Sequence, residues 1–191
     1  MMGSRGSLHF KNTDTEKIVR ALVEAYADET NKLNREVTHN NWGKPFILIS
    51  KTFVSVYDGS FASYGDMDSE GKLLSQCVGQ PVLGFNNIND DMMCLSVYAG
   101  QEEVTGATFA EGEWWDTIDL AALMDTMQLE YTAEDWEPVF AEEMEEPDEM
   151  LEAFEKLTGQ TYIAAQSEVA GRWPGAKLVQ ETEEITVFAI A

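Results

Sequence analysis

The chain has 191 residues, of which 44% are hydrophobic, and a formal net charge of −23 at pH 7. The charge is concentrated, because the stretch from Leu73 to Glu155 has 21 Asp and Glu residues and no Lys or Arg, whereas the flanking parts are each close to neutral. Abundant large apolar residues exclude a disordered chain. The concentrated negative charge argues against nucleic acid and anionic membranes as partners, and it attracts basic surfaces.

The length fits one domain, and we expect a single α+β domain over residues 8–191 with a helical subregion at 116–159. Residues 1–7 (MMGSRGS) are small and polar, which is typical of a tail. No apolar run approaches the ~18 residues that span a bilayer, and no signal peptide is recognised, so we expect a cytoplasmic location. Cys77 and Cys94 lie among apolar residues and are expected to be buried reduced thiols, with a disulfide or a reactive thiol as the alternative.

In chain order, Leu8–Phe10 predicts a short strand at the edge of a sheet. Thr13 and Glu16 form a capping-box pattern that begins a helix running to about Leu33, with an apolar stripe for packing on the sheet. Apolar runs and turn residues predict the remaining elements of this half: strands at 46–49, 53–57, 81–85, 92–98 and 103–109, and a helix at 68–78 capped by Gly79.

From Asp116 the pattern becomes helical. The first helix is expected to be capped by Asp116 or Thr117, the second begins near Thr132 and is interrupted by Pro138, and the third begins at Pro147 and ends at Gly159. Strands at 162–165 and 184–190 follow, with a loop at 171–175 between them. We therefore predict a mixed or antiparallel sheet with two helices on one face and a C-terminal cluster of short helices. The pattern leaves open whether the two late strands join this sheet.

No catalytic residue is predicted. The histidines are His9 and His39, and neither lies near a Ser or Cys in a recognisable nucleophile motif. Gly175–Lys177 (GAK) lacks the upstream glycine of a phosphate-binding loop, so no nucleotide is expected.

No metal or other cofactor is predicted either. The asparagines and aspartates of residues 86–91 offer oxygen ligands for calcium, but their spacing lacks the alternating acids, central glycine and closing glutamate of a calcium loop. A turn between two strands explains them as well. Acidic pairs are so abundant that finding two close together carries no information. An enzyme or metal-binding domain that uses scattered carboxylates, with Asp58 and Asp90 among them, remains the alternative.

Aromatic residues flanked by acids are typical of a surface that binds a basic partner. The predicted partner-binding residues come from the EGEWWD motif and from the later acidic run: Glu111, Glu113, Trp114, Trp115, Asp116, Glu142, Glu143, Glu145 and Glu146. Neighbouring side chains of an extended segment point in opposite directions, so one tryptophan should be buried and the other more exposed. The alternative is that both tryptophans only pack in the core.

Residues 53–98 contain FVSVYDGSF followed by LLSQCVGQPVLGFNNINDDMMCLSVY. This order of strand, helix, strand and acidic turn resembles small bacterial proteins of the immunity-protein type. The resemblance implies a toxin-neutralising protein without an active site. We therefore predict a non-enzymatic acidic protein that binds a basic partner protein, as an immunity protein or inhibitor would, and DNA mimicry is a third hypothesis.

Overall fold

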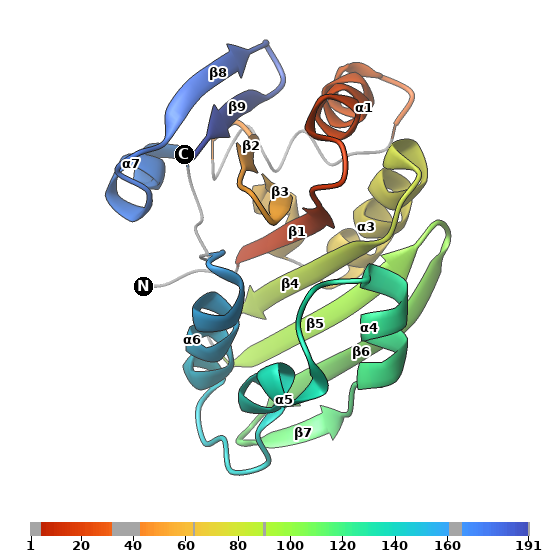
Figure 1. The fold of residues 1–191 in the computed structure, drawn as a ribbon, viewed down its shortest axis with the longest axis vertical. Coiled ribbons are helices and arrows are strands. Elements are labelled where there is room, and N and C mark those ends of the chain that lie inside the picture. The colour runs from red at the N-terminus through yellow and green to blue at the C-terminus, as the bar shows by residue number, and fades with distance from the viewer. Residues whose placement is uncertain (1–4, 32–42, 63, 90, 161–165, 191) are drawn as a thin grey trace.

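The computed structural model describes residues 5–31, 43–62, 64–89, 91–160 and 166–190 (Figure 1). Its centre is one nine-stranded sheet of order β7-β6-β5-β4-β1-β3-β2-β9-β8. Neighbouring strands are antiparallel except β2 and β9, which are parallel. The strands are β1 (Arg5–Lys11), β2 (Phe46–Ile49), β3 (Phe53–Tyr57), β4 (Val82–Ile88), β5 (Met92–Ala99), β6 (Glu102–Ala110), β7 (Glu113–Asp116), β8 (Lys177–Glu181) and β9 (Thr186–Ala189).

Helices pack on both faces of this mixed sheet, so the predicted α+β class is confirmed. The α-helices are α1 (Thr15–Ala27), α3 (Tyr64–Val78), α4 (Leu120–Met127), α5 (Ala133–Trp136), α6 (Pro147–Thr158) and α7 (Val169–Arg172). The described residues also form the short 3-10 helices η2 (Gly59–Ala62), η3 (Glu137–Phe140) and η4 (Gln166–Glu168).

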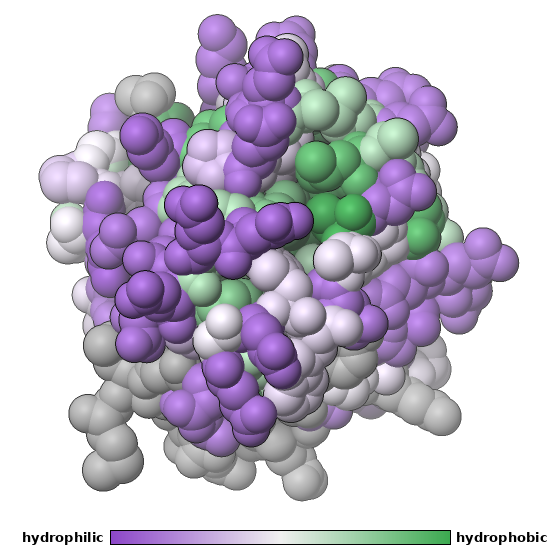
Figure 2. Space-filling view, turned by 90° about the horizontal axis from the view of Figure 1, so that it is seen from below, coloured by the Kyte–Doolittle hydropathy of each residue, from purple (hydrophilic) through white to green (hydrophobic). Residues whose placement is uncertain are grey.

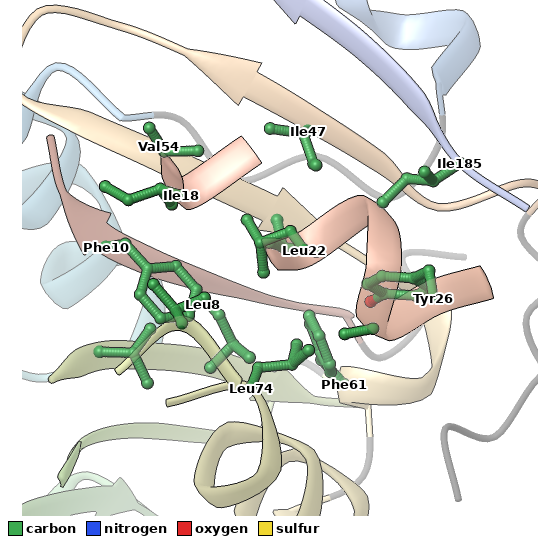
Figure 3. Close-up of a cluster of buried hydrophobic side chains, with 14 of the residues drawn as sticks. Leu8, Phe10, Ile18, Leu22, Tyr26, Ile47, Val54, Phe61, Leu74 and Ile185 are labelled. Carbon is green, nitrogen blue, oxygen red and sulfur yellow. The ribbon is translucent and has the colours of Figure 1, made fainter. Parts of the chain in front are cut away.

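The first face of the sheet packs against α1 and α3. Leu8 and Phe10 of β1 point to this face because alternate residues of a strand share a side. They meet Ile18 and Leu22 of α1 and Leu74 of α3 in a buried cluster (Figure 3). Complete burial of one such aliphatic side chain stabilises the fold by about 1.5–3 kcal/mol, so this stripe explains why α1 docks here.

The opposite face packs against α4, α5 and α6 in a second cluster. Phe154 of α6 stacks on Phe85 of β4 with ring centroids 4.8 Å apart, and Met150, one turn earlier, is also buried. The acidic residues of α6 therefore lie on the side of the helix that faces away from the core. This face carries the predicted helical subregion.

The predicted edge position of the first strand is wrong. β1 lies between β4 and β3 in the sheet, and His9 is fully buried. The strand also begins at Arg5, so Gly6 and Ser7, which the sequence placed in a tail, are part of the sheet and buried. β4 and β3 pair with this strand on its two sides, and the ring of Phe154 on α6 packs against His9 with ring centroids 5.5 Å apart.

Several predicted boundaries differ from the observed ones. Asp14, and not Thr13, caps α1 by accepting a hydrogen bond from the Lys17 backbone at 3.1 Å, and the helix ends at Ala27. Asp119 caps α4 by accepting from the Ala122 backbone at 3.0 Å. α3 begins before residue 68, at Tyr64.

The C-terminal part contains a strand that the sequence did not predict, β8, which pairs with β9. β9 in turn pairs with β2, so the predicted strand at 184–190 joins the main sheet. The predicted loop at 171–175 includes the end of α7. The predicted strand at 162–165 lies outside the described residues.

Candidate functional site

The structure brings the two predicted acidic stretches side by side. The indole N–H of Trp114 on β7 donates to the backbone carbonyl of Ala141 at 3.0 Å. A Cβ atom placed on Gly112, in the β6–β7 turn, would lie 3.8 Å from the carbonyl oxygen of Glu145. The turn that carries Glu111 and the segment at 141–146 are therefore neighbours at one end of the molecule.

The two adjacent tryptophans differ in burial, as predicted. Trp114 is partly buried against Phe109 and Phe140, with ring centroids 5.2 and 5.6 Å away. Trp115 keeps 51% of its surface exposed. The pairing of β6 with β7 is irregular here, because Phe109 is opposite Trp114 and Thr108 is opposite Asp116. Trp114 thus fixes the position of the acidic stretches, and Trp115 is available for contact.

All the predicted carboxylates are exposed. We call them the acidic surface: Glu111, Glu113, Asp116, Glu142, Glu143, Glu145 and Glu146. Among the described residues the ion pairs are Lys44–Glu181 and Lys72–Asp68, so no described base neutralises the acidic surface. Figure 2 views the molecule from this end and shows hydrophilic side chains over most of the face, with a hydrophobic patch among them.

An acidic groove of about 590 Å³ adjoins this surface, between α5 and α6. Its lining is Glu134, Asp135, Pro138, Glu149, Glu152, Ala153, Lys156 and Leu157. Glu149 connects the two features, because its Oε2 accepts hydrogen bonds from the backbone N–H groups of Glu145 at 2.7 Å and Glu146 at 3.3 Å. The groove has carboxylates on its walls and apolar side chains between them.

The groove residues are not among the predicted partner-binding residues. Glu149, Glu152 and Lys156 recur at helical spacing opposite Met150 and Phe154, so the periodicity of α6 contained a signal for one exposed charged side, with carboxylates in its first turns and one base in its last turn. Asp135 is held by the capping box of α5, and its pKa is lowered because the Thr132 backbone and hydroxyl donate to its carboxylate. No sequence signal indicated that α5 and α6 would form two walls of one groove.

His9 belongs to a buried hydrogen-bonded chain below α6. Its Nε2 is 2.8 Å from Ser7 Oγ and its Nδ1 is 2.8 Å from Ser55 Oγ. Ser55 donates to Gln160 Oε1 at 3.1 Å, and Gln160 Nε2 donates to Ser50 Oγ at 3.1 Å. Burial lowers the pKa of His9 to about 3, so the ring is neutral at pH 7. This series of hydrogen bonds connects Gln160, which follows the end of α6, to the sheet. All of its side chains are buried, so none of them can contact a substrate in solvent. His39 lies outside the described residues.

A second buried polar cluster joins α1, β3 and α3. The Tyr26 hydroxyl donates to Asp58 Oδ2 at 2.8 Å, and the Ser60 hydroxyl donates to Glu70 Oε2 at 2.7 Å. Burial and the two nearby carboxylates raise the pKa of Tyr26. These groups are buried, so Asp58 connects elements of the fold, and Asp90 lies outside the described residues.

The turn in the asparagine-rich stretch is shorter than the predicted turn at 86–91. Asn86 and Asn87 are buried residues of β4, and the backbone N–H of Asp91 donates to the Ile88 carbonyl at 3.1 Å to close the turn. Asn89 has a positive φ of 55°, which asparagine tolerates. Within the described ranges, no group of three or more His, Cys, Asp or Glu residues is arranged to hold a metal ion.

The two cysteines are free thiols. Cys94 is buried as predicted, but Cys77 is exposed on α3, so the prediction of two core thiols is wrong for Cys77. Leu74 and Val78 on the same helix are buried, whereas Cys77 between them faces solvent. The apolar residues around Cys77 in the sequence do not reveal which side of the helix it occupies.

Among the residues that the structure describes, no helix combines the length and the apolar character needed to cross a membrane. Comparisons with protein-family models, with curated proteins and with solved structures gave no match.

Proposed function

We propose that this chain is a non-enzymatic binding protein of the immunity or inhibitor type, which holds a basic partner protein against the acidic surface and the adjoining acidic groove. The observation that carries the proposal is that the acidic stretches at 111–116 and 142–146 lie side by side. The Trp114–Ala141 hydrogen bond joins them, Gly112 lies close to the Glu145 backbone, and every carboxylate of the acidic surface is exposed. A scattered distribution around the helices would have pointed to solubility instead.

The composition of the surface suits a protein partner. Trp115 offers a large apolar side chain with half of its surface exposed, and the exposed carboxylates of its sequence neighbours Glu113 and Asp116 can pair with Lys or Arg. The groove between α5 and α6 adds apolar contact from Pro138, Ala153 and Leu157. Unpaired negative charge attracts a basic partner from a distance and raises its association rate by ~10 to 10³-fold, an effect that salt weakens. We place this activity in the cytoplasm, where free thiols such as Cys77 persist.

The experiment uses the immobilised chain to capture proteins from the lysate of its source cells at low and high salt, followed by identification and purification of the captured protein. Binding of the purified partner is then compared for two variants. The first replaces four carboxylates of the acidic surface by Gln: Glu113, Glu142, Glu143 and Glu145. The matched control replaces four exposed carboxylates elsewhere by Gln: Glu16, Glu24, Glu29 and Glu183.

Both variants have the same net charge, so they separate local recognition from total charge. The proposal expects a basic partner whose binding falls at least about tenfold in the first variant and changes little in the control. Equal losses in the two variants, or a purified partner without a basic surface, would contradict the proposal.

A further inference from the structure

β8 is an edge strand with unusual exposure. It lies at one end of the sheet with β9 as its neighbour, and all five of its residues are exposed. Leu178 is 58% exposed and Val179 is 59% exposed, the highest values for large hydrophobic residues in the described part of the chain. An edge strand presents unpaired backbone N–H and C=O groups to which another strand can add.

The apolar surface of β8 continues onto a neighbouring groove. Val179 lines a groove of about 480 Å³ together with Val19 and Val23 of α1 and Ile49 of β2. A second strand that pairs with β8 would therefore lie beside this groove, and its side chains could contact the apolar residues of α1 and β2 as well as those of β8. This area matters because pairing of two five-residue strands alone buries less surface than a stable interface needs.

The charges of β8 are complementary to those of a second β8. The strand reads Lys177-Leu-Val-Gln-Glu181, with a base at one end and an acid at the other. In an antiparallel pair centred on Val179, each Lys177 is opposite Glu181 of the second copy, and the two Val179 side chains meet at the twofold axis. Any register shifted along the strand separates these charges. Glu181 also binds Lys44 at 2.9 Å, and its carboxylate has a second oxygen for Lys177 of the second copy.

We propose that two copies of this chain pair through β8, antiparallel and centred on Val179, so that the two sheets become continuous. The interface is isologous, as a twofold dimer requires. The inference concerns a different surface from the proposed partner-binding face, and either can fail without the other.

The distribution of charge permits this dimer in spite of the net charge of −23. β8 and the acidic β7 end are the opposite edges of the nine-stranded sheet. The eight gaps between them span roughly 40 Å at about 4.8 Å each. That separation exceeds the Debye length of ~8 Å at physiological salt, so the acidic ends of two copies joined through β8 hardly repel each other. The acidic surfaces then lie at the two far ends of the dimer.

Two features of β8 are also found in sheets that avoid edge pairing. The pairing with β9 shifts between Leu178 and Gln180, and Lys177 adds a charge to the edge. If they serve that purpose here, the chain is a monomer. The mass of the full chain in solution decides between these two outcomes.

The first experiment measures mass by sedimentation equilibrium from low micromolar concentration upward at physiological salt. We expect a concentration-dependent dimer for the unchanged chain. Val179→Lys puts two positive charges at the twofold axis and should weaken the dimer at least about tenfold. The control is Val104→Lys, which changes another exposed valine, on β6 (39% exposed), and should leave the dimer intact. A monomer at all concentrations, or equal weakening by both substitutions, would overturn the proposal.

The second experiment tests the register by charge exchange. Lys177→Glu alone and Glu181→Lys alone each place like charges opposite one another and should weaken self-association. A mixture of the two variants restores both opposite-charge pairs in a mixed dimer. We expect the mixture to dimerise more tightly than either variant by itself, which circular dichroism on each variant can separate from a loss of folding. No gain on mixing would overturn the proposed register.

Discussion

The indole N–H of Trp114 and the backbone carbonyl of Ala141 are 3.0 Å apart and form a hydrogen bond across 27 residues of sequence. The bond joins β7 to the segment that follows η3. Each of these two pieces carries several carboxylates that repel those of the other. Trp114 therefore holds together two stretches of like charge, and Trp115, exposed beside it, is free to contact a partner.

Replacing Trp114 by Phe should loosen this junction. The change keeps an aromatic ring against Phe109 and Phe140 but removes the donor to Ala141, which should lower the free energy of unfolding by about 1 kcal/mol. Hydrogen exchange of residues 141–146 should also become faster. Urea unfolding and exchange mass spectrometry measure the two effects. The control, Trp115→Phe, should change stability by less than about 0.5 kcal/mol; equal effects of the two substitutions would show that the hydrogen bond has no positioning role.

His9 should make stability depend on pH. Burial lowers its pKa from 6.5 to about 3, so between these values the unfolded chain binds a proton that the folded chain does not. The free energy of unfolding therefore has its full value, as far as His9 is concerned, above pH 6.5, and it decreases as the pH falls toward 3. The expected slope approaches about 1.4 kcal/mol per pH unit below pH 6.

The comparison that isolates His9 is His9→Gln, followed by urea unfolding at several pH values between about 5 and 7. All other titratable groups are the same in the two proteins, so the difference between the two slopes isolates His9 even if the variant is less stable at every pH. The variant should have the flatter profile. Identical slopes in the two proteins would mean that His9 is not held neutral in the folded state.

Gly6 lies where β1 passes close to η2. A Cβ atom at this position would be 2.4 Å from the carbonyl oxygen of Phe61 and 2.5 Å from its Cβ, and a backbone oxygen cannot move aside cheaply. Gly6→Ala should therefore destabilise the fold by about 1–3 kcal/mol. Gly171→Ala is the control, because Gly171 has open space around it. The stability of this variant should equal that of the unchanged protein or be slightly higher. Thermal unfolding of both variants tests this, and an unchanged midpoint for Gly6→Ala would show that the two elements separate readily.

Screening should stabilise the protein. The acidic surface and groove concentrate like charges, and salt shortens the Debye length from about 10 Å at 0.1 M to about 3 Å at 1 M. We expect the melting temperature to rise with NaCl over this range. The rise should be smaller in the variant with Gln at residues 113, 142, 143 and 145 than in the matched variant with Gln at residues 16, 24, 29 and 183. The same rise in both would locate the repulsion in the total charge and not in the acidic surface.

Local patterns were sufficient for many individual elements. Strands β2 and β3 have the predicted bounds because short runs of β-branched and aromatic residues between turn residues specify them. α6 begins at Pro147 and is capped by Gly159 with a positive φ of 67°, as predicted from two residues whose backbone preferences are intrinsic. The opposite burial of Trp114 and Trp115 likewise follows from the alternation of an extended segment.

Strands and side-chain positions that depend on contacts with distant segments were not predictable from the sequence. β8 has no strong strand signal, and pairing with β9 makes it a strand. β1 was expected at an edge, and its central place depends on β4, about eighty residues later. His9 belongs to the strand that is predicted at an edge, and Phe154 of α6 covers it. In each case the decisive contact joins segments that no local window contains.

The sequence by itself determined that this is an α+β protein with most of its negative charge in one stretch, because composition and hydrophobic periodicity act locally. Tertiary structure decided where that charge lies. The return of the chain after η3 to the β6–β7 turn makes one acidic surface from two stretches, and the order of the strands places that surface at the opposite end of the sheet from β8. Both arrangements arise from long-range packing and pairing, whose free energy depends on contacts between distant segments and not on the preference of any one of them.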